Sequence, residues 1–240
     1  MWWESITVAL ASVPVLARWR QHRWQWFDSF ELEAMRCFAR LWHRCSSNGT
    51  APLPHSGPAI LIANHPNHSD PAFLLANSRR VLQFLHAQEY FDVFLLRRLF
   101  RRIGCIPVRR DGHDVIGLRQ ALRRLREGKV LCVFPQGQIS LPGDGSARSV
   151  KAGAALLALR SRAPVIPVHI SGGPQSRDLM RDWLQPSGGV HVAFGPPVDL
   201  SSYYGRPITH GLLAEVAAKL MHCIADLADT TTGATGRDSH

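Results

Sequence analysis

Short runs of apolar residues alternate along this chain with stretches in which apolar residues recur every three or four positions. The apolar runs predict strands near residues 59–63, 81–85, 105–108, 130–134, 165–170 and 190–194. The helical spacing predicts helices near residues 70–77, 91–100, 114–126, 151–162, 177–183 and 208–229. Strands and helices that alternate in this way predict an α/β fold with a mixed, largely parallel central sheet flanked by helices.

The N-terminal segment follows a different pattern. Residues 6–17 are apolar or small, and as a helix they would span about 18 Å, too short for a hydrocarbon core of about 30 Å. Residues 18–27 interleave arginines with aromatic side chains that favour the lipid headgroup level, and residues 1–4 lack the cations of a signal peptide. The pattern predicts a monotopic anchor on an anionic membrane surface. The alternative is a helix packed on its own domain.

The segment after the predicted anchor indicates where the main domain begins. Residues 28–45 combine apolar positions at helical spacing with Arg36, Arg40 and Arg44, which predicts an amphipathic helix with a basic face. A stretch rich in serine, glycine and proline follows. We therefore expect membrane-associating helices and a linker in residues 1–57, the main domain in residues 58–229, and a disordered tail in residues 230–240.

The composition limits which binding partners and which cellular compartment fit this chain. With 240 residues and 45% hydrophobic content, the chain fits one large domain. The net charge of +10 suits nucleic acid, anionic lipid or an acidic substrate, although the preference for arginine over lysine also fits a GC-rich genome. Nucleic acid is disfavoured, because the aromatic residues cluster in the apolar N-terminal segment. The five cysteines form no Cys-x-x-Cys pair, which favours reduced thiols and, with the anchor, the cytoplasmic face of the inner membrane.

A candidate catalytic pair follows the first predicted strand of the main domain. His65 comes just after that strand, and Asp70 follows five positions later. Ligand sites of α/β sheets lie beyond the carboxyl ends of strands, so chemistry is expected in this loop. An imidazole accepts a proton near neutral pH, and a carboxylate on its other nitrogen orients it. This spacing is expected roughly 0.6 times by chance in such a composition, so it needs support from other motifs.

Two other interpretations of this loop stay open. His65, His68 and Asp70 belong to the residue types that ligate zinc or iron. Asp70 also precedes Pro71, a pattern typical of a helix start, so its carboxylate could cap that helix while still orienting His65. We expect His68 to be an exposed loop residue and assign it no role.

Four sequence blocks in order carry a resemblance to a known family. They are Asn64, His65 and Asp70; then Gly104, Ile106 and Arg110; then Phe134, Pro135, Gly137 and Ser140, followed by residues 151–154; and finally Val165, Pro167 and Val168. Over roughly residues 58–200 the chain resembles the glycerolipid acyltransferases, typified by the bacterial 1-acyl-glycerol-3-phosphate acyltransferases.

The resemblance implies a role for each matching residue. His65 would be the catalytic base and Asp70 the residue that orients it. The implied substrate-binding residues are Asn64, Arg109, Arg110, Phe134, Pro135, Gln136, Gly137, Gln138 and Lys151. Acyl transfer to an alcohol requires a base, and the direct mechanism that the resemblance supports uses no protein nucleophile, no metal ion and no cofactor. Backbone N–H groups at loop–helix junctions would stabilise the oxyanion.

The third block departs from the family pattern. Gln136 stands where the family has glutamate, and Gln138 and Ile139 stand where it has threonine and arginine. Glutamine keeps a hydrogen-bond acceptor and loses the charge. Losing the arginine weakens the grip on a phosphate-bearing acceptor, because an arginine–phosphate contact is charge-assisted and often bidentate.

We therefore expect an enzyme that moves a fatty acyl group from acyl-CoA or acyl carrier protein to the hydroxyl of a lysolipid, in phospholipid biosynthesis. Lysophosphatidic acid is the default acceptor and would give phosphatidic acid. The altered third block keeps another lysophospholipid or a lyso-aminolipid open as the acceptor. A non-enzymatic basic protein that binds membranes or nucleic acid is the alternative from another class.

Overall fold

The computed structural model describes residues 33–88, 94–109, 114–141, 151–176 and 178–234. Among these residues the strands are β1 (Ser46–Ser47), β2 (Ala59–Ala63), β3 (Leu82–Ala87), β4 (Ile106–Val108), β5 (Val130–Val133), β6 (Val165–Ser171) and β7 (His191–Phe194). The helices are η1 (Phe38–Trp42), α3 (Asp70–Ala76), α4 (Phe94–Ile103), α5 (Val115–Arg126), α6 (Ala152–Ser161), α7 (Leu179–Leu184), η4 (Ser201–Tyr203) and α8 (His210–Ala234).

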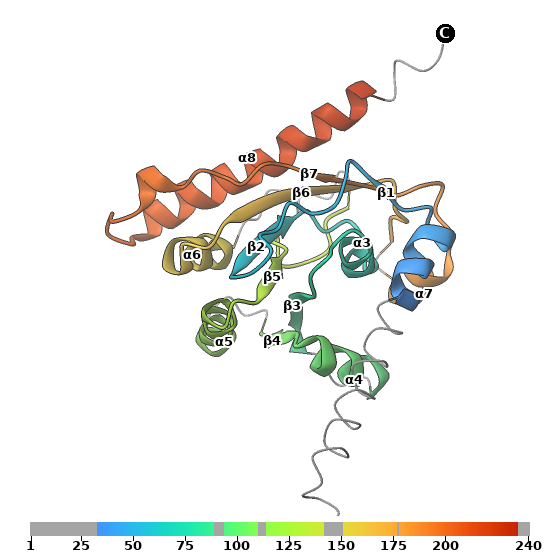
Figure 1. Ribbon diagram of the computed structural model, residues 1–240, viewed down its shortest axis with the longest axis horizontal. Coiled ribbons are helices and arrows are strands. Elements are labelled where there is room, and N and C mark those ends of the chain that lie inside the picture. Colours follow the sequence, from blue (N-terminus) through green and yellow to red (C-terminus); the bar gives the residue numbers. More distant parts are fainter. Residues whose placement is uncertain (1–32, 89–93, 110–113, 142–150, 177, 235–240) are drawn as a thin grey trace, which may run out of the picture.

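The seven strands form one sheet in the order β1-β7-β6-β2-β5-β3-β4. Strands β6, β2, β5, β3 and β4 are parallel to one another, whereas β7 is antiparallel to β6 and parallel to β1. This arrangement confirms the predicted α/β fold with a mixed, largely parallel sheet. Figure 1 shows α5 and α6 on one side of the sheet and α3 on the other.

The central strand β2 shows why an apolar run predicted a strand here. All five of its residues are buried, because helices cover both faces of a parallel sheet. Ile60 and Ile62 pack in the core beneath α5, α6 and α8, and Leu61 packs with α3 on the opposite face. The strand pairs with β5 on one side and β6 on the other, so it places the residue that follows it at the middle of the sheet edge.

The structure differs from two details of the predicted division of the chain. Residues 46–57 were expected to be a linker, yet Ser46–Ser47 forms β1 and pairs with β7, 144 to 145 residues away in sequence. The tail was expected to be disordered from residue 230, yet α8 continues to Ala234. Residues 33–42 are helical as predicted, ending in the short π-helical turn η1. The predicted anchor in residues 1–32 and the tail in residues 235–240 lie outside the described residues.

Gly172 supplies a test of the turn that follows β6. Its φ is +76°, and a Cβ there would lie 2.2 Å from the carbonyl oxygen of Gly189. Gly57 also has a positive φ, +84°, but a Cβ there would meet no atom within 4 Å. Gly172→Ala should therefore lower the free energy of unfolding by about 3 kcal/mol and Gly57→Ala by about 1 kcal/mol, measured by urea denaturation. Equal losses would mean that the backbone at Gly172 relaxes without penalty.

Candidate active site

The loops that follow β2 and β5 meet at one edge of the sheet and form the site. The ring of His65, from the first loop, stacks on the ring of Phe134, from the second, with centroids 4.0 Å apart and an interplanar angle of 15°. The backbone N–H of Ser140 donates to the carbonyl oxygen of His65 at 2.8 Å. The parallel pairing of β2 with β5 thus joins the first and third sequence blocks.

His65 and Asp70 form the predicted pair. Nδ1 of His65 lies 2.8 Å from Oδ2 of Asp70, and the carboxylate is fully buried while the imidazole keeps 17% of its side-chain surface exposed. A carboxylate on Nδ1 favours the tautomer that carries its proton there, so Nε2 is the nitrogen able to accept another proton. The geometry is that of an oriented general base.

Asp70 is not the cap of α3. Ser69 occupies the N-cap position, and Asp70 is the first residue of the helix. Its Oδ2 also accepts the backbone N–H of Asn67 at 3.0 Å. Burial raises the pKa of Asp70 well above its ordinary value, and the hydrogen bond from Asn67 opposes that rise. The capping interpretation is therefore replaced by a turn in which the carboxylate faces back toward His65.

Asn64 has a structural contact rather than a place on the cavity wall. Its Nδ2 donates to the carbonyl oxygen of Ile170 at 2.8 Å, and its Oδ1 accepts the N–H of Ile170 at 2.7 Å. These two bonds continue the pairing of β2 with β6 beyond the end of β2. Asn64 thereby fixes the direction in which the chain leaves the sheet toward His65.

The third block forms a tight turn over the site. The N–H of Gly137 donates to the carbonyl oxygen of Phe134 at 2.9 Å, and Gly137 has a φ of +68°. A Cβ at Gly137 would lie 2.6 Å from Cε of Lys151, so the glycine allows the lysine side chain to pass close by. Gln136, inside the turn, is buried, does not line the cavity, and its Oε1 has no hydrogen-bond partner among the described residues.

A cavity of about 840 Å³ opens beside His65. Seven of the predicted site residues line it, namely His65, Arg109, Phe134, Pro135, Gly137, Gln138 and Lys151. The rest of the wall is largely apolar and includes side chains from α3, β3, α4, α5, α6 and α7. Asn64, Asp70 and Gln136 lie outside this lining, and Arg110 lies outside the described residues. The size suits a long apolar ligand group.

Cationic and apolar side chains both line the cavity. Arg109 and Lys151 bring cations to the cavity, whereas Ile139, which stands at the family's arginine position, brings an apolar side chain. The first residues of α6, including Gly153 and Ala154, also line the cavity, and the side chain of the N-cap residue, Lys151, makes no capping hydrogen bond. Backbone N–H groups of a helix's first turn favour negative charge nearby.

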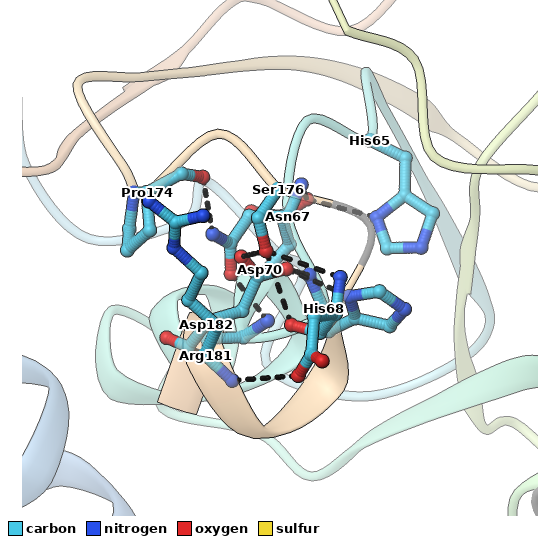
Figure 2. Close-up of polar contacts among 10 residues, drawn as sticks. His65, Asn67, His68, Asp70, Pro174, Ser176, Arg181 and Asp182 are labelled. Carbon is cyan, nitrogen blue, oxygen red and sulfur yellow. Dashed lines mark hydrogen bonds and ion pairs between the residues drawn. The ribbon is translucent and has the colours of Figure 1, made fainter. Parts of the chain in front are cut away.

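Sequence reasoning missed a second histidine and its partner. His68 is not an exposed loop residue: only 10% of its side-chain surface is exposed, and it lines the cavity. Nδ1 of His68 lies 2.7 Å from Oδ2 of Asp182, which is fully buried on α7 (Figure 2). Asp182 comes from a point 114 residues further along the chain, so spacing gave no signal for it.

The metal interpretation requires the two histidines and a carboxylate to converge. In the structure His65 turns to Asp70 and His68 turns to Asp182. Among the described residues, no three histidine, cysteine or acidic side chains gather in a way that could hold a metal ion.

Known proteins are similar to the part of this chain that contains the four sequence blocks. The sequence profile of the family described as Acyltransferase matches residues 44–171, more than half of the chain. The chloroplastic 1-acyl-sn-glycerol-3-phosphate acyltransferase LPAT1 of Arabidopsis thaliana is 23% identical over 183 residues, covering 72% of this chain and 51% of that protein. The 1-acyl-sn-glycerol-3-phosphate acyltransferase of Streptococcus pneumoniae is 25% identical over 144 residues, covering 59% and 50%.

A solved structure shares the fold. The crystal structure of the 1-acyl-sn-glycerophosphate acyltransferase PlsC of Thermotoga maritima matches with a TM-score of 0.60 and 20% identity, covering 82% of this chain and 79% of that one. The chain spans about half the length of these two curated relatives. The four blocks, the meeting of the first and third at one sheet edge and the profile match lead to one conclusion: this chain belongs to the acyltransferase family.

Proposed function

We propose that this protein is an O-acyltransferase that moves a fatty acyl group from a thioester, acyl-CoA or acyl carrier protein, to the hydroxyl of a lysolipid. The observation that carries the proposal is the His65–Asp70 pair, whose imidazole lies on the wall of a cavity large enough for an acyl chain. Membership of the acyltransferase family supports it. Relatives named as acting on 1-acyl-glycerol-3-phosphate make lysophosphatidic acid the default acceptor and phosphatidic acid the product.

The chemistry proceeds by direct transfer. Nε2 of His65 takes the proton of the acceptor hydroxyl while its oxygen attacks the thioester carbonyl carbon. The tetrahedral intermediate carries its negative charge on the former carbonyl oxygen, and the N–H groups of the first turn of α6 are the donors we assign to it. The C–S bond then breaks and releases the thiol. The reaction uses no metal ion and no organic cofactor beyond the thioester substrate.

The buried carboxylate makes His65 a better base. As the imidazole takes the proton, positive charge forms beside Asp70, and the attraction between the two charges is strong because little solvent reaches the pair. The stack on Phe134 limits the rotation of the ring. The pair is thereby held in a productive orientation before substrate binds.

The acceptor's phosphate would lie near Arg109 and Lys151. Both line the cavity, and Arg110 follows Arg109 directly in sequence. Ile139 replaces the family's arginine in the same wall, so fewer cations are available to the headgroup. A lysolipid whose headgroup needs fewer cationic contacts is therefore the second candidate acceptor.

We place the protein at the cytoplasmic face of the inner membrane, as a monotopic or peripheral protein on anionic lipid. No helix in the described part of the chain is long and apolar enough to cross a bilayer. Exposed apolar side chains, Leu41 and Trp42 on η1 and Met180 and Leu184 on α7, support a contact with lipid. The two elements touch through the stacked rings of Phe38 and Trp183. Trp183 also lines the cavity, so lipid and cavity would be adjacent.

The catalytic pair is tested by substitution. His65→Ala should lower the transfer rate by about 1,000-fold or more, because no other group on the proposed path removes the hydroxyl proton. Asp70→Asn should leave a small residual rate, since the imidazole remains but loses its orienting charge. Transfer of a labelled acyl group from acyl-CoA to lysophosphatidic acid measures both, with melting temperatures to confirm folding. Wild-type turnover in folded His65→Ala would contradict the assignment of the base.

The acceptor is tested at Ile139. Ile139→Arg restores a cation to the cavity wall and should raise kcat/KM for lysophosphatidic acid by about tenfold relative to lysophosphatidylethanolamine, because one charge-assisted hydrogen bond is added. Ile139→Met, similar in size and uncharged, is the matched control. If neither variant changes the ratio, the phosphate does not reach this wall.

The membrane face is tested with two equally exposed residues. Leu184 on α7 is 64% exposed and Ile116 on α5 is 68% exposed. Leu184→Glu should reduce binding to anionic vesicles several-fold, because it places a charge where lipid is expected, whereas Ile116→Glu should leave binding unchanged. Vesicle sedimentation measures both. Equal reductions would show that the contact is not specific to η1 and α7.

A further inference from the structure

A second imidazole–carboxylate pair lies beside the first, and the imidazole of each pair lines the cavity. Its Nδ1–Oδ2 distance, 2.7 Å between His68 and Asp182, matches the 2.8 Å between His65 and Asp70. Both carboxylates are fully buried and both imidazoles are nearly so. Figure 2 shows the two rings on the same side of their carboxylates. The mechanism above uses only one of these pairs.

The two carboxylates differ in the hydrogen bonds that they accept. Oδ2 of Asp182 accepts the backbone N–H of His68 at 3.1 Å as well as its ring N–H, and Oδ1 accepts the hydroxyl of Ser176 at 2.7 Å. Oδ2 of Asp70 also accepts two donors, but Oδ1 has no hydrogen-bond partner among the described residues. Both oxygens of Asp182 are therefore hydrogen-bonded, whereas Asp70 accepts hydrogen bonds from the described residues on one oxygen only.

This difference assigns opposite roles to the two histidines. A carboxylate whose two oxygens are both hydrogen-bonded is suited to face a cationic imidazole ring, so the geometry suits His68 to deliver a proton during the reaction. Asp70, whose pKa burial raises, faces the ring that takes the hydroxyl proton in the mechanism above. Two titratable groups in different environments beside one reaction centre commonly divide into an acid and a base.

A structural role alone does not account for the arrangement. To attach α7 to the loop before α3, the carboxylate of Asp182 would need only the backbone N–H of His68, and the hydroxyl of Ser69 already donates to the carbonyl oxygen of Asp182. Neither contact requires an imidazole on the cavity wall. A buried charge is also weak evidence for added stability.

We propose that His68, positioned by Asp182, is a second catalytic residue, the general acid that protonates the leaving thiolate. This inference rests on the proposed function. His65 removes the hydroxyl proton as the C–O bond forms. When the C–S bond breaks, the electron pair goes to sulfur, and sulfur takes the proton from Nε2 of His68. Solvent then carries the proton from His65 to His68, which restores both residues.

The dependence on the leaving group tests the proposal. Two donors with the same acyl chain are compared, a thioester of N-acetylcysteamine and a thioester of 4-nitrothiophenol, with the same lysolipid and with thiol release as the readout. An alkyl thiol has a pKa near 8.5, whereas the nitroaryl thiol is far more acidic and leaves without a proton. His68→Ala should lower kcat/KM by about 100-fold for the alkyl donor and by less than about threefold for the aryl donor.

The controls separate this role from a structural one. Asp182→Asn should show the same selective loss to a smaller degree, because it keeps the side-chain volume and removes the charge that positions His68. His222 and Asp226 form an exposed pair on α8, outside the cavity, at 3.6 Å. His222→Ala should change neither rate.

The outcomes distinguish this inference from the proposed function. A wild-type protein that releases thiol from neither donor would overturn both. A wild-type protein active on both donors, with His68→Ala losing equal factors for each, would overturn the acid role alone. A loss seen only as a raised KM for the lysolipid would also overturn it, since that result would make His68 a headgroup contact.

Discussion

Burying the Asp70 carboxylate is the constraint on which the site depends. A charge with no access to water requires donors, and here the ring of His65 and the N–H of Asn67 supply them. Asn67 is itself held, because its Oδ1 accepts the N–H of Ser69 and its Nδ2 donates to the carbonyl oxygen of Pro174. The loop between β2 and α3 therefore has little freedom, and that restriction orients the imidazole.

The same loop links the two halves of the cavity wall. His65 faces the β5 loop through Phe134, while His68 faces α7 through Asp182. Asp70 and Asp182 are close enough for the negative charge of Asp182 to raise the pKa of Asp70. The two pairs are therefore electrostatically coupled, and a change at either should be felt by the other. The base and acid roles proposed for the two histidines would therefore depend on the whole loop.

The structure also revises how the third block is understood. Gln136, the residue that departs from the family's glutamate, is buried inside the turn and off the cavity wall, whereas Ile139 lies on it. Of the two departures, the missing arginine is thus the one that lies on the cavity wall, where the proposed acceptor would bind. Asn64, expected to bind substrate, extends the sheet through Ile170 instead.

By itself, the sequence determined the α/β class, the strands and helices of the main domain, and the His65–Asp70 pair, because these follow from apolar periodicity and from contacts within five residues. Only the tertiary structure decided that Ser46–Ser47 joins the sheet and that His68 has Asp182 as its partner. The physical reason is sequence distance. Pairing a strand with β7 or a histidine with α7 depends on how the layers pack, and local pattern carries no information about groups more than 100 residues apart.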